Sequence, residues 1–388
     1  MSPSHVICHK LDTNTPRKRH ATKAFSYTSL KHSSFGLQRT EQLISIGVRI
    51  MKVSGQSTKI AWVLAMAIAL PLSTANAEEK ASKPKVEVRG KIYGNWGMSL
   101  DEDADNYNAF NVTRAYVTVK ADVSESFATH VTTDIALVKH SDDTKLRTYL
   151  KYAYLEWKDP MPGLKVRFGA AGTGLISLHD EFTGRRWVEK SFTNRTEILA
   201  SSDFGIHAMG KHSDGMFTYQ ASIVNGGGYS KVETDKAKTA QLRLTVDPLS
   251  GAEMELPISA FVSYGLGSEE TDIVAAAAMG FGSSFGKAWV EFVMPTQGNV
   301  KGMGYMATLL PKIFDIGSLM LRYDVYDPNT DVDNDDTAKL YAGFTHDFAK
   351  KISAGLLYER ETSHSADDVG AITDELSHGV FIKMQAGF

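Results

Sequence analysis

The chain ends with the residues VFIKMQAGF at positions 380–388, which alternate between two chemical characters. Every second residue from Val380 to Phe388 is apolar, whereas Lys383 and Gln385 lie on the other parity. Side chains of a β-strand alternate between its two faces. A strand with one apolar face and one mostly polar face fits the closing strand of a barrel surrounded by lipid, with Val380 and its parity partners facing that lipid. From this segment alone, the last strand of a soluble β-sandwich remains the alternative.

Residues 51–77 have the pattern of a secretory signal. Met51 is followed by Lys52 and Lys59, an apolar run at 60–70, and Ala75-Asn76-Ala77. We therefore predict a signal peptide at 51–77, cleaved after Ala77, and a periplasmic linker at 78–85. The apolar run is shorter than the roughly 20 residues of a transmembrane helix. We interpret residues 1–50 as an upstream extension that is disordered or not translated; an organellar transit peptide is the rival interpretation.

Removal of residues 1–77 would change the charge of the chain. The full sequence has 42 Lys and Arg and 45 Asp and Glu, and ten and two of these lie in 1–77, which leaves 32 bases, 43 acids and a net charge of −11. Such an acidic exported chain argues against nucleic-acid binding. The single cysteine, Cys8, also lies in the removed part. The mature chain would thus have no thiol for a disulfide, a metal or nucleophilic catalysis.

From residue 86 onward, segments of about ten residues with period-two alternation are separated by turns. The pattern predicts an all-β, transmembrane antiparallel β-barrel of about 16 strands over 86–388, because bacterial outer-membrane barrels have even strand counts. The expected strands are 86–100, 109–121, 126–137, 148–158, 163–170, 202–212, 216–224, 239–247, 257–266, 271–282, 286–294, 301–310, 316–326, 338–348, 351–360 and 377–388.

The connections alternate between short and long, as the two sides of such a barrel require. Tight links are expected at 123–125, 159–162, 213–215, 283–285 and 349–350, with longer ones on the same side near 250–251 and 311–312. Long outer loops are expected at 101–105, 171–201, 226–228, 327–336 and 361–375. Tyrosines near strand ends, Tyr93 and Tyr152 among them, fit either an aromatic girdle or the lumen.

The segment 171–201 is the third outer loop, which in sixteen-stranded porins folds back into the lumen and narrows it. Charges in such a confined space select ions strongly. A solvated surface loop with ordinary ion pairs is the alternative. The candidates for a pore constriction are Asp180, Glu181, Arg185, Arg186, Lys190 and Arg195.

The polar parity of the strands predicts a basic pore wall, in which twelve bases oppose seven acids. An anion-preferring channel would show this excess, although the uncertain parity of Glu156 and Lys151 leaves its size open. Arg89, Lys91, Lys339 and Lys383 belong to the twelve. The main candidates for basic pore-lining residues are Arg114, Lys120, Lys165, Arg167, Lys211, Arg243, Lys287 and Arg322.

The runs FNVTRAYV at 110–117 and YQASIVNG at 219–226, together with the closing strand, resemble the phosphate-selective porin O/P family. The resemblance spans the mature chain. It implies a sixteen-stranded, usually trimeric, passive diffusion channel. The second strand of that family is richer in arginine than this one, where Tyr116 follows Arg114 and Ala115. Phosphate selectivity does not carry over, because the anion ladder of the family has no residue-by-residue match here. Phe388 resembles the terminal aromatic residue that outer-membrane assembly machinery reads.

The expected function is therefore that of a bacterial outer-membrane porin, a passive channel for small hydrophilic solutes with a preference for anions, phosphate included. The expected partners are outer-membrane lipid, two further copies in a homotrimer, and the barrel-assembly machinery. We expect no enzymatic activity, cofactor, metal or nucleic acid. The alternatives are a non-selective porin, an adhesin, or a barrel enzyme that uses His207 and Ser222 with a carboxylate. The acidic run Asp331-Val332-Asp333-Asn334-Asp335 lacks the glycine and the last glutamate of a calcium loop.

Overall fold

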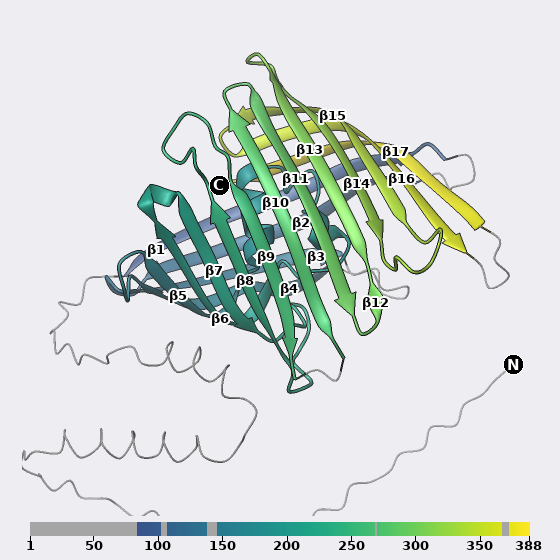
Figure 1. Cartoon of the computed structure of the whole chain (residues 1–388). Coiled ribbons are helices and arrows are strands. Elements are labelled where there is room, and N and C mark those ends of the chain that lie inside the picture. Colours follow the sequence, from purple (N-terminus) through teal and green to yellow (C-terminus); the bar gives the residue numbers. More distant parts are fainter. Residues whose placement is uncertain (1–83, 102–106, 138–145, 268–269, 367–371) are drawn as a thin grey trace, which may run out of the picture. The chain divides into compact units, whose positions relative to one another are not determined.

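The computed structural model describes residues 84–101, 107–137, 146–267, 270–366 and 372–388. These residues form a closed antiparallel β-barrel (Figure 1), in which each strand pairs with its neighbours along the chain and β1 pairs with β17. The closing register runs from Lys91 opposite Gly387 to Ser99 opposite Gly379. The predicted upstream extension, the signal peptide with Ala77, and residues 78–83 lie outside the described residues.

The barrel wall consists of sixteen strands when β12 and β13 are counted together, which confirms the predicted fold. The strand β12 has two residues and pairs with the end of β11, and β13 pairs with the rest of β11. We therefore count β12 and β13 as one strand of the wall. The strands are β1 (Lys85–Ser99), β2 (Asn108–Asp122), β3 (Phe127–Leu137), β4 (Leu146–Lys158), β5 (Leu164–Gly172), β6 (Ser202–His212), β7 (Phe217–Val224), β8 (Lys238–Val246), β9 (Ile258–Leu266), β10 (Asp272–Ser283), β11 (Gly286–Gln297), β12 (Val300–Lys301), β13 (Met303–Ile313), β14 (Gly317–Asp327), β15 (Thr337–Ala349), β16 (Ile352–Ala366) and β17 (Ile372–Gly387).

Two predicted connections are wrong. The segment 361–375 was expected to be a loop, but the β16–β17 ladder continues to Ala366 opposite Ile372. A hairpin ladder needs only paired backbone groups, so polar side chains can extend it. The link near 311–312 is also shorter than expected, because β13 continues to Ile313.

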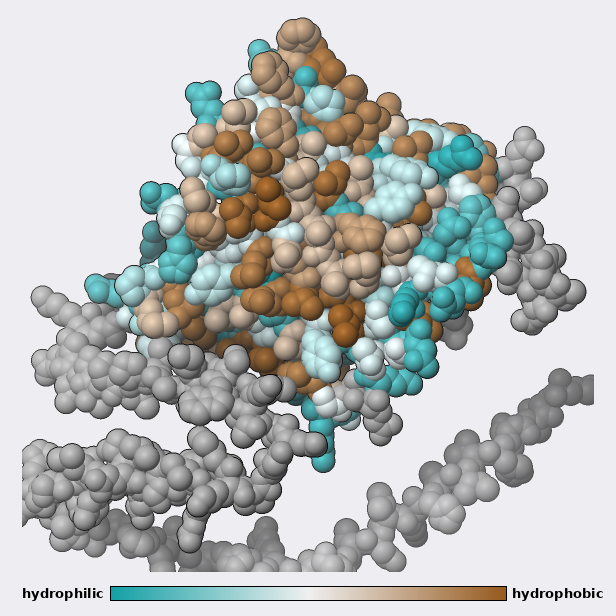
Figure 2. Space-filling view, viewed as in Figure 1, coloured by the Kyte–Doolittle hydropathy of each residue, from teal (hydrophilic) through white to brown (hydrophobic). Residues whose placement is uncertain are grey.

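The outer face of the barrel is apolar. On β17, the exposed fractions of Ile382 and Met384 are 47% and 50%, whereas Lys383 between them is only 8% exposed. The predicted parity of this strand is therefore correct. Figure 2 shows hydrophobic residues gathered over the middle of the visible barrel wall. This pattern suits strands that contact lipid outside and polar groups inside.

A β-bulge in β4 settles a parity that alternation alone left open. Thr132 of β3 opposes Tyr152, and Thr133 opposes Leu150, which leaves Lys151 as the extra residue of β4. Lys151 is 5% exposed and thus turned away from the outer face. The bulge explains why Lys151 and Glu156, five residues apart, can both face the interior.

The helical elements of the described chain are short. They are α3 (Gly174–Thr183), α4 (Phe192–Arg195) and the 3₁₀ turn η1 (Ser213–Gly215). Within the described residues, none of these helices has the length and apolar character needed to cross a membrane. The link from β6 to β7 is tight because Ser213 and Asp214 adopt φ angles of 50° and 54°, a left-handed conformation that reverses the chain in few residues.

Candidate functional site: a basic cavity beside loop 173–201

The connection from β5 to β6, which we call loop 173–201, is closed at its base by hydrogen bonds. The Thr173 amide donates to the Ser201 carbonyl at 3.1 Å, and the Thr173 hydroxyl donates to the Ala200 carbonyl at 2.5 Å. Helix α3 follows Thr173 and ends at Thr183. The next residue, Gly184, adopts a φ of 64° and donates its amide to the Asp180 carbonyl. The loop is therefore a compact folded unit with its own hydrogen bonds.

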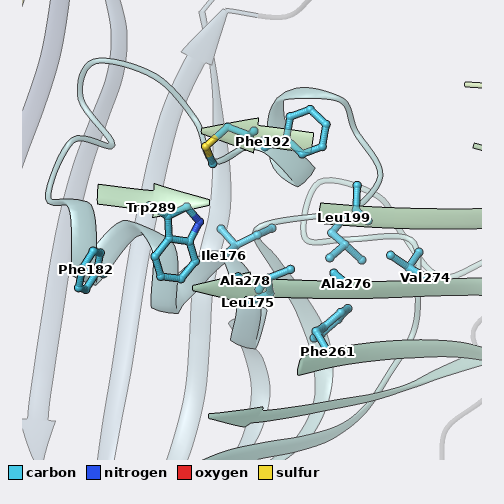
Figure 3. Packing of buried hydrophobic residues seen from close by; sticks show 12 residues of the cluster. Leu175, Ile176, Phe182, Phe192, Leu199, Phe261, Val274, Ala276, Ala278 and Trp289 are labelled. Carbon is cyan, nitrogen blue, oxygen red and sulfur yellow. The ribbon is translucent and has the colours of Figure 1, made fainter. Parts of the chain in front are cut away.

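Loop 173–201 packs against the face of β9 to β13 opposite their exposed apolar side chains. Leu175, Ile176 and Phe192 of the loop are at most 2% exposed. Each such side chain stabilises the packed state by about 1.5–3 kcal/mol. Figure 3 shows the loop residues beside the strand residues that they contact. The cluster also contains Phe182, Leu199, Phe261, Val274, Ala276, Ala278, Trp289, Val293 and Met306.

Four basic side chains from four different strands donate to carbonyl oxygens of the loop or its first helix. We call Arg243, Lys287, Arg322 and Lys383 the wall bases. Their acceptors are the carbonyls of Gly174 at 3.3 Å, Phe182 at 2.7 Å, Lys190 at 2.6 Å and Val188 at 2.7 Å. A hydrogen bond from a charged donor contributes about 1.5–3 kcal/mol. The wall bases thus fasten the loop to β8, β11, β14 and β17.

Acidic groups complete this fastening. Asp324, with no exposed side-chain surface, accepts from Arg322 at 2.7 Å and from Arg195 of the loop at 2.9 Å. Glu189 of the loop accepts from the Tyr341 hydroxyl at 3.1 Å. Burial raises the pKa of Glu189, but the positive charges of Lys383 and its neighbours outweigh burial, and the net pKa is lowered. Glu189 is therefore ionised at neutral pH.

The structure separates the six constriction candidates into two groups. Asp180, Glu181 and Arg186 line a common cavity, and Arg186 lies 3.3 Å from Asp180. The others lie against the strands or the wall bases. Arg185 is 3.7 Å from Asp347, Arg195 is paired with Asp324, and the Lys190 carbonyl accepts from Arg322.

This cavity has a volume of about 570 Å³ and lies between loop 173–201 and the wall formed by β1 to β4. It is rich in bases: seven basic side chains line it against two acidic ones, Asp180 and Glu181. Confined charges of one sign raise the local concentration of their counter-ions. The basic side chains are Arg89, Lys91, Lys120, Lys151, Arg186, Lys350 and Lys351.

The predicted pore-lining bases lie in several different places. Lys120 lines the cavity, while Arg114 pairs with Asp134 at 2.9 Å and Arg167 pairs with Glu156 at 2.7 Å. Lys165 and Lys211 are exposed, and the remaining three candidates are wall bases.

The cavity also contains three tyrosines that are not among the predicted site residues. Tyr93, Tyr116 and Tyr152 line it beside Lys151. Tyr93 is 5% exposed, and its ring meets that of Tyr116 edge to face at 5.6 Å between centroids. The position of Tyr93 between Lys91 and Asn95 on the polar parity was the signal that could have identified it.

His207 and Ser222, the pair considered for a barrel enzyme, are in contact, but both side chains are buried. His207 Nδ1 lies 3.0 Å from the Ser222 hydroxyl, and the two side chains are 1% and 5% exposed. Among the described residues, no carboxylate pairs with the His207 ring, so the third member of a hydrolase triad has no candidate there. The same part of the chain holds no group of three or more His, Cys, Asp or Glu suited to a metal ion.

Comparison with solved structures supports the barrel fold. It is similar to a loop-deletion form of OmpT from Vibrio cholerae (TM-score 0.56, 12% identity, 79% of this chain and 100% of that chain). It is also similar to an anion-selective porin from Comamonas acidovorans (TM-score 0.55, 12% identity, 79% of this chain and 100% of that chain). A third similar structure is the outer-membrane channel DcaP of Acinetobacter baumannii (TM-score 0.55, 13% identity, 79% of this chain and 99% of that chain).

No family model and no curated protein sequence matches the chain. The structural likeness therefore defines a class of fold, the closed sixteen-stranded barrel of outer-membrane porins.

Proposed function

We propose that the protein is an outer-membrane diffusion channel for small hydrophilic solutes that prefers anions. The closed barrel with an apolar outer face supports insertion into lipid. We infer that loop 173–201 is the inward-folded third outer loop and forms the constriction, because its contacts reach strands from β8 to β17. The cavity that remains beside β1 to β4 would be the path for solutes.

The excess of basic side chains around the cavity is the observation that carries the anion preference. Lys91, Lys120 and Lys151 line the cavity without an ion pair among the described residues, whereas Asp180 is compensated by Arg186. Wall bases do not contribute in the same way, because their charges are directed at loop carbonyls. Inside a narrow protein-walled space such uncompensated charges act at a lower effective dielectric constant than in water.

Export and assembly form a second part of the proposal. We expect cleavage after Ala77, insertion into the bacterial outer membrane, a homotrimer, and a role for Phe388 in recognition by the assembly machinery. The amide of Phe388 donates to the Gly90 carbonyl at 3.1 Å, and its ring covers the space that Gly90 leaves open. Mass spectrometry of the purified protein should give Glu78 as its first residue, and a first residue within 1–50 would contradict the predicted signal.

The channel proposal is tested by electrical recording. Protein expressed from the full sequence and purified from outer membranes is added to a planar bilayer that separates two potassium chloride concentrations. We expect stepwise increases in conductance and a reversal potential of the sign that chloride permeation gives. No conductance would contradict the channel, and a potassium-favouring reversal potential would contradict the anion preference.

A further inference from the structure

We infer that the cavity between loop 173–201 and β1 to β4 is a binding site for small organic anions that carry a ring, in preference to inorganic phosphate. This inference rests on the proposed function only for the route by which the solute arrives. Binding itself follows from the side chains that line the cavity, and it is measurable without any conductance.

The first observation is a set of basic side chains that form no ion pair within the described residues. Lys91 and Lys120 make neither a hydrogen bond nor an ion pair there, and Lys151 makes one hydrogen bond, to the Ser201 hydroxyl at 3.4 Å. Lys151 is only 5% exposed. A buried lysine that forms no ion pair would gain from a negative group beside it, so a bound anion would lower the free energy of this arrangement.

The second observation is that three phenol rings surround the same space. Tyr93, Tyr116 and Tyr152 line the cavity. Their hydroxyls have no hydrogen-bond partner among the described residues, and a phenol hydroxyl can donate to an oxyanion. The Lys151 ammonium lies 5.1 Å from the centroid of Tyr116 and 5.8 Å from that of Tyr152. The rings therefore provide apolar surface directly beside the positive charge, which a bare inorganic ion would leave without contact.

The third observation concerns size and direction. A volume of about 570 Å³ lies within the range of roughly 300–1,000 Å³ typical of sites for organic ligands. The acidic side chains, Asp180 and Glu181, both belong to the loop side of the cavity, whereas Lys91, Lys120 and Lys151 belong to the strands. An anionic group would thus be directed at the strands, with the ring of the solute against the tyrosines.

The inference is tested by calorimetry on the full-length expression product, solubilised in detergent, with phenyl phosphate and inorganic phosphate as probes. We expect phenyl phosphate to bind at least about tenfold more tightly. Equal or weaker binding of phenyl phosphate would overturn the inference. Binding without conductance would contradict only the channel proposal, while anion conductance without phenyl phosphate binding would contradict only this inference.

Two variants locate the site. Lys120→Met should weaken both probes by about tenfold, because it removes a charged donor. Tyr116→Leu should weaken phenyl phosphate about two- to tenfold more than it weakens inorganic phosphate, because both probes lose one hydroxyl donor but only phenyl phosphate loses ring contact. Lys312→Met, at an exposed lysine that does not line the cavity, is the matched control. An equal loss in the control, or no change in either cavity variant while the barrel stays folded, would overturn the assignment.

Discussion

Arg322 shows how one residue can connect the barrel wall to the loop. Its side chain is 2% exposed, bonds Asp324 with two nitrogens, and donates to the Lys190 carbonyl. The parity of its strand correctly predicts that Arg322 faces the interior. Parity does not show whether an inward-facing base contacts solvent or a carbonyl oxygen. That distinction depends on the path of a loop more than 120 positions away in the sequence.

Replacement of this residue should weaken the fold. Arg322→Met removes the strongest partner of buried Asp324, and breaking such a buried pair costs about 3 kcal/mol. We expect a lower urea midpoint, measured by tryptophan fluorescence, for this variant than for the exposed-site control Lys312→Met. Equal midpoints for the two variants would show that the Arg322 network does not stabilise the loop.

Glu189 predicts how the stability depends on pH. Its carboxyl has a pKa below the ordinary value of 4.5, because Lys383, Lys339 and Arg322 outweigh the effect of burial. A carboxyl whose pKa is lower in the folded state stabilises that state above its unfolded pKa, and this stabilisation is lost as the pH falls through the folded pKa.

The difference in unfolding free energy between the unmodified protein and Glu189→Gln should therefore be constant from about pH 7 to about pH 5 and shrink at lower pH. Urea unfolding at several pH values measures it. A difference that grows on acidification would contradict the depressed pKa of Glu189.

At the scale of elements, the sequence of β10 indicates more than a period of two. Its residues 274–279 read VAAAAM, apolar on both parities. One face contacts the outside, and the other carries Val274, Ala276 and Ala278, which pack under loop 173–201. Small side chains on both faces indicate a strand whose inner surface is covered by another element. The β-bulge at Lys151, by contrast, shows in the sequence only as the conflicting parity of Lys151 and Glu156, and its position is recognised only from the pairing with β3.

Phe192 anchors the second half of loop 173–201. It has no exposed surface, and its ring lies so close to Gly304 that a side chain there would collide with it. Phe192→Ala should destabilise the folded protein by about 3–5 kcal/mol, because truncation leaves a cavity. If the loop narrows the pore, its loosening should also increase single-channel conductance and current noise. Phe285→Ala, at a turn residue that is 83% exposed, is the control, and indistinguishable conductance for the two variants would contradict a constriction by the loop.

At the scale of the whole molecule, the alternation of side chains was sufficient to predict the barrel. Each of the sixteen expected strands overlaps an observed strand of the barrel, because an apolar outer face and a mostly polar inner face impose a period of two on most of the strands. The composition of the cavity could not be predicted from the alternation of side chains. It is formed by Tyr93, Tyr116 and Lys151 together with Arg186, and only the closed barrel and the folded loop bring these residues to one place.

We propose that ions cross the barrel through this basic cavity, and thiol labelling tests this path most directly. Cys8 is the single cysteine of the sequence and lies in the part predicted to be removed, so Lys120→Cys would provide the one thiol of the exported protein. The substitution removes one positive charge from the cavity. A methanethiosulfonate reagent that carries a sulfonate then adds a negative charge at the same position.

We predict that this modification reduces the channel current and shifts the reversal potential in a potassium chloride gradient away from anion preference. The same reagent should not alter the current or the reversal potential of the protein with its native Lys120, or of the control variant Lys312→Cys. An unaltered current and reversal potential of Lys120→Cys, after mass spectrometry has shown that the thiol has reacted, would contradict a conducting path through the cavity.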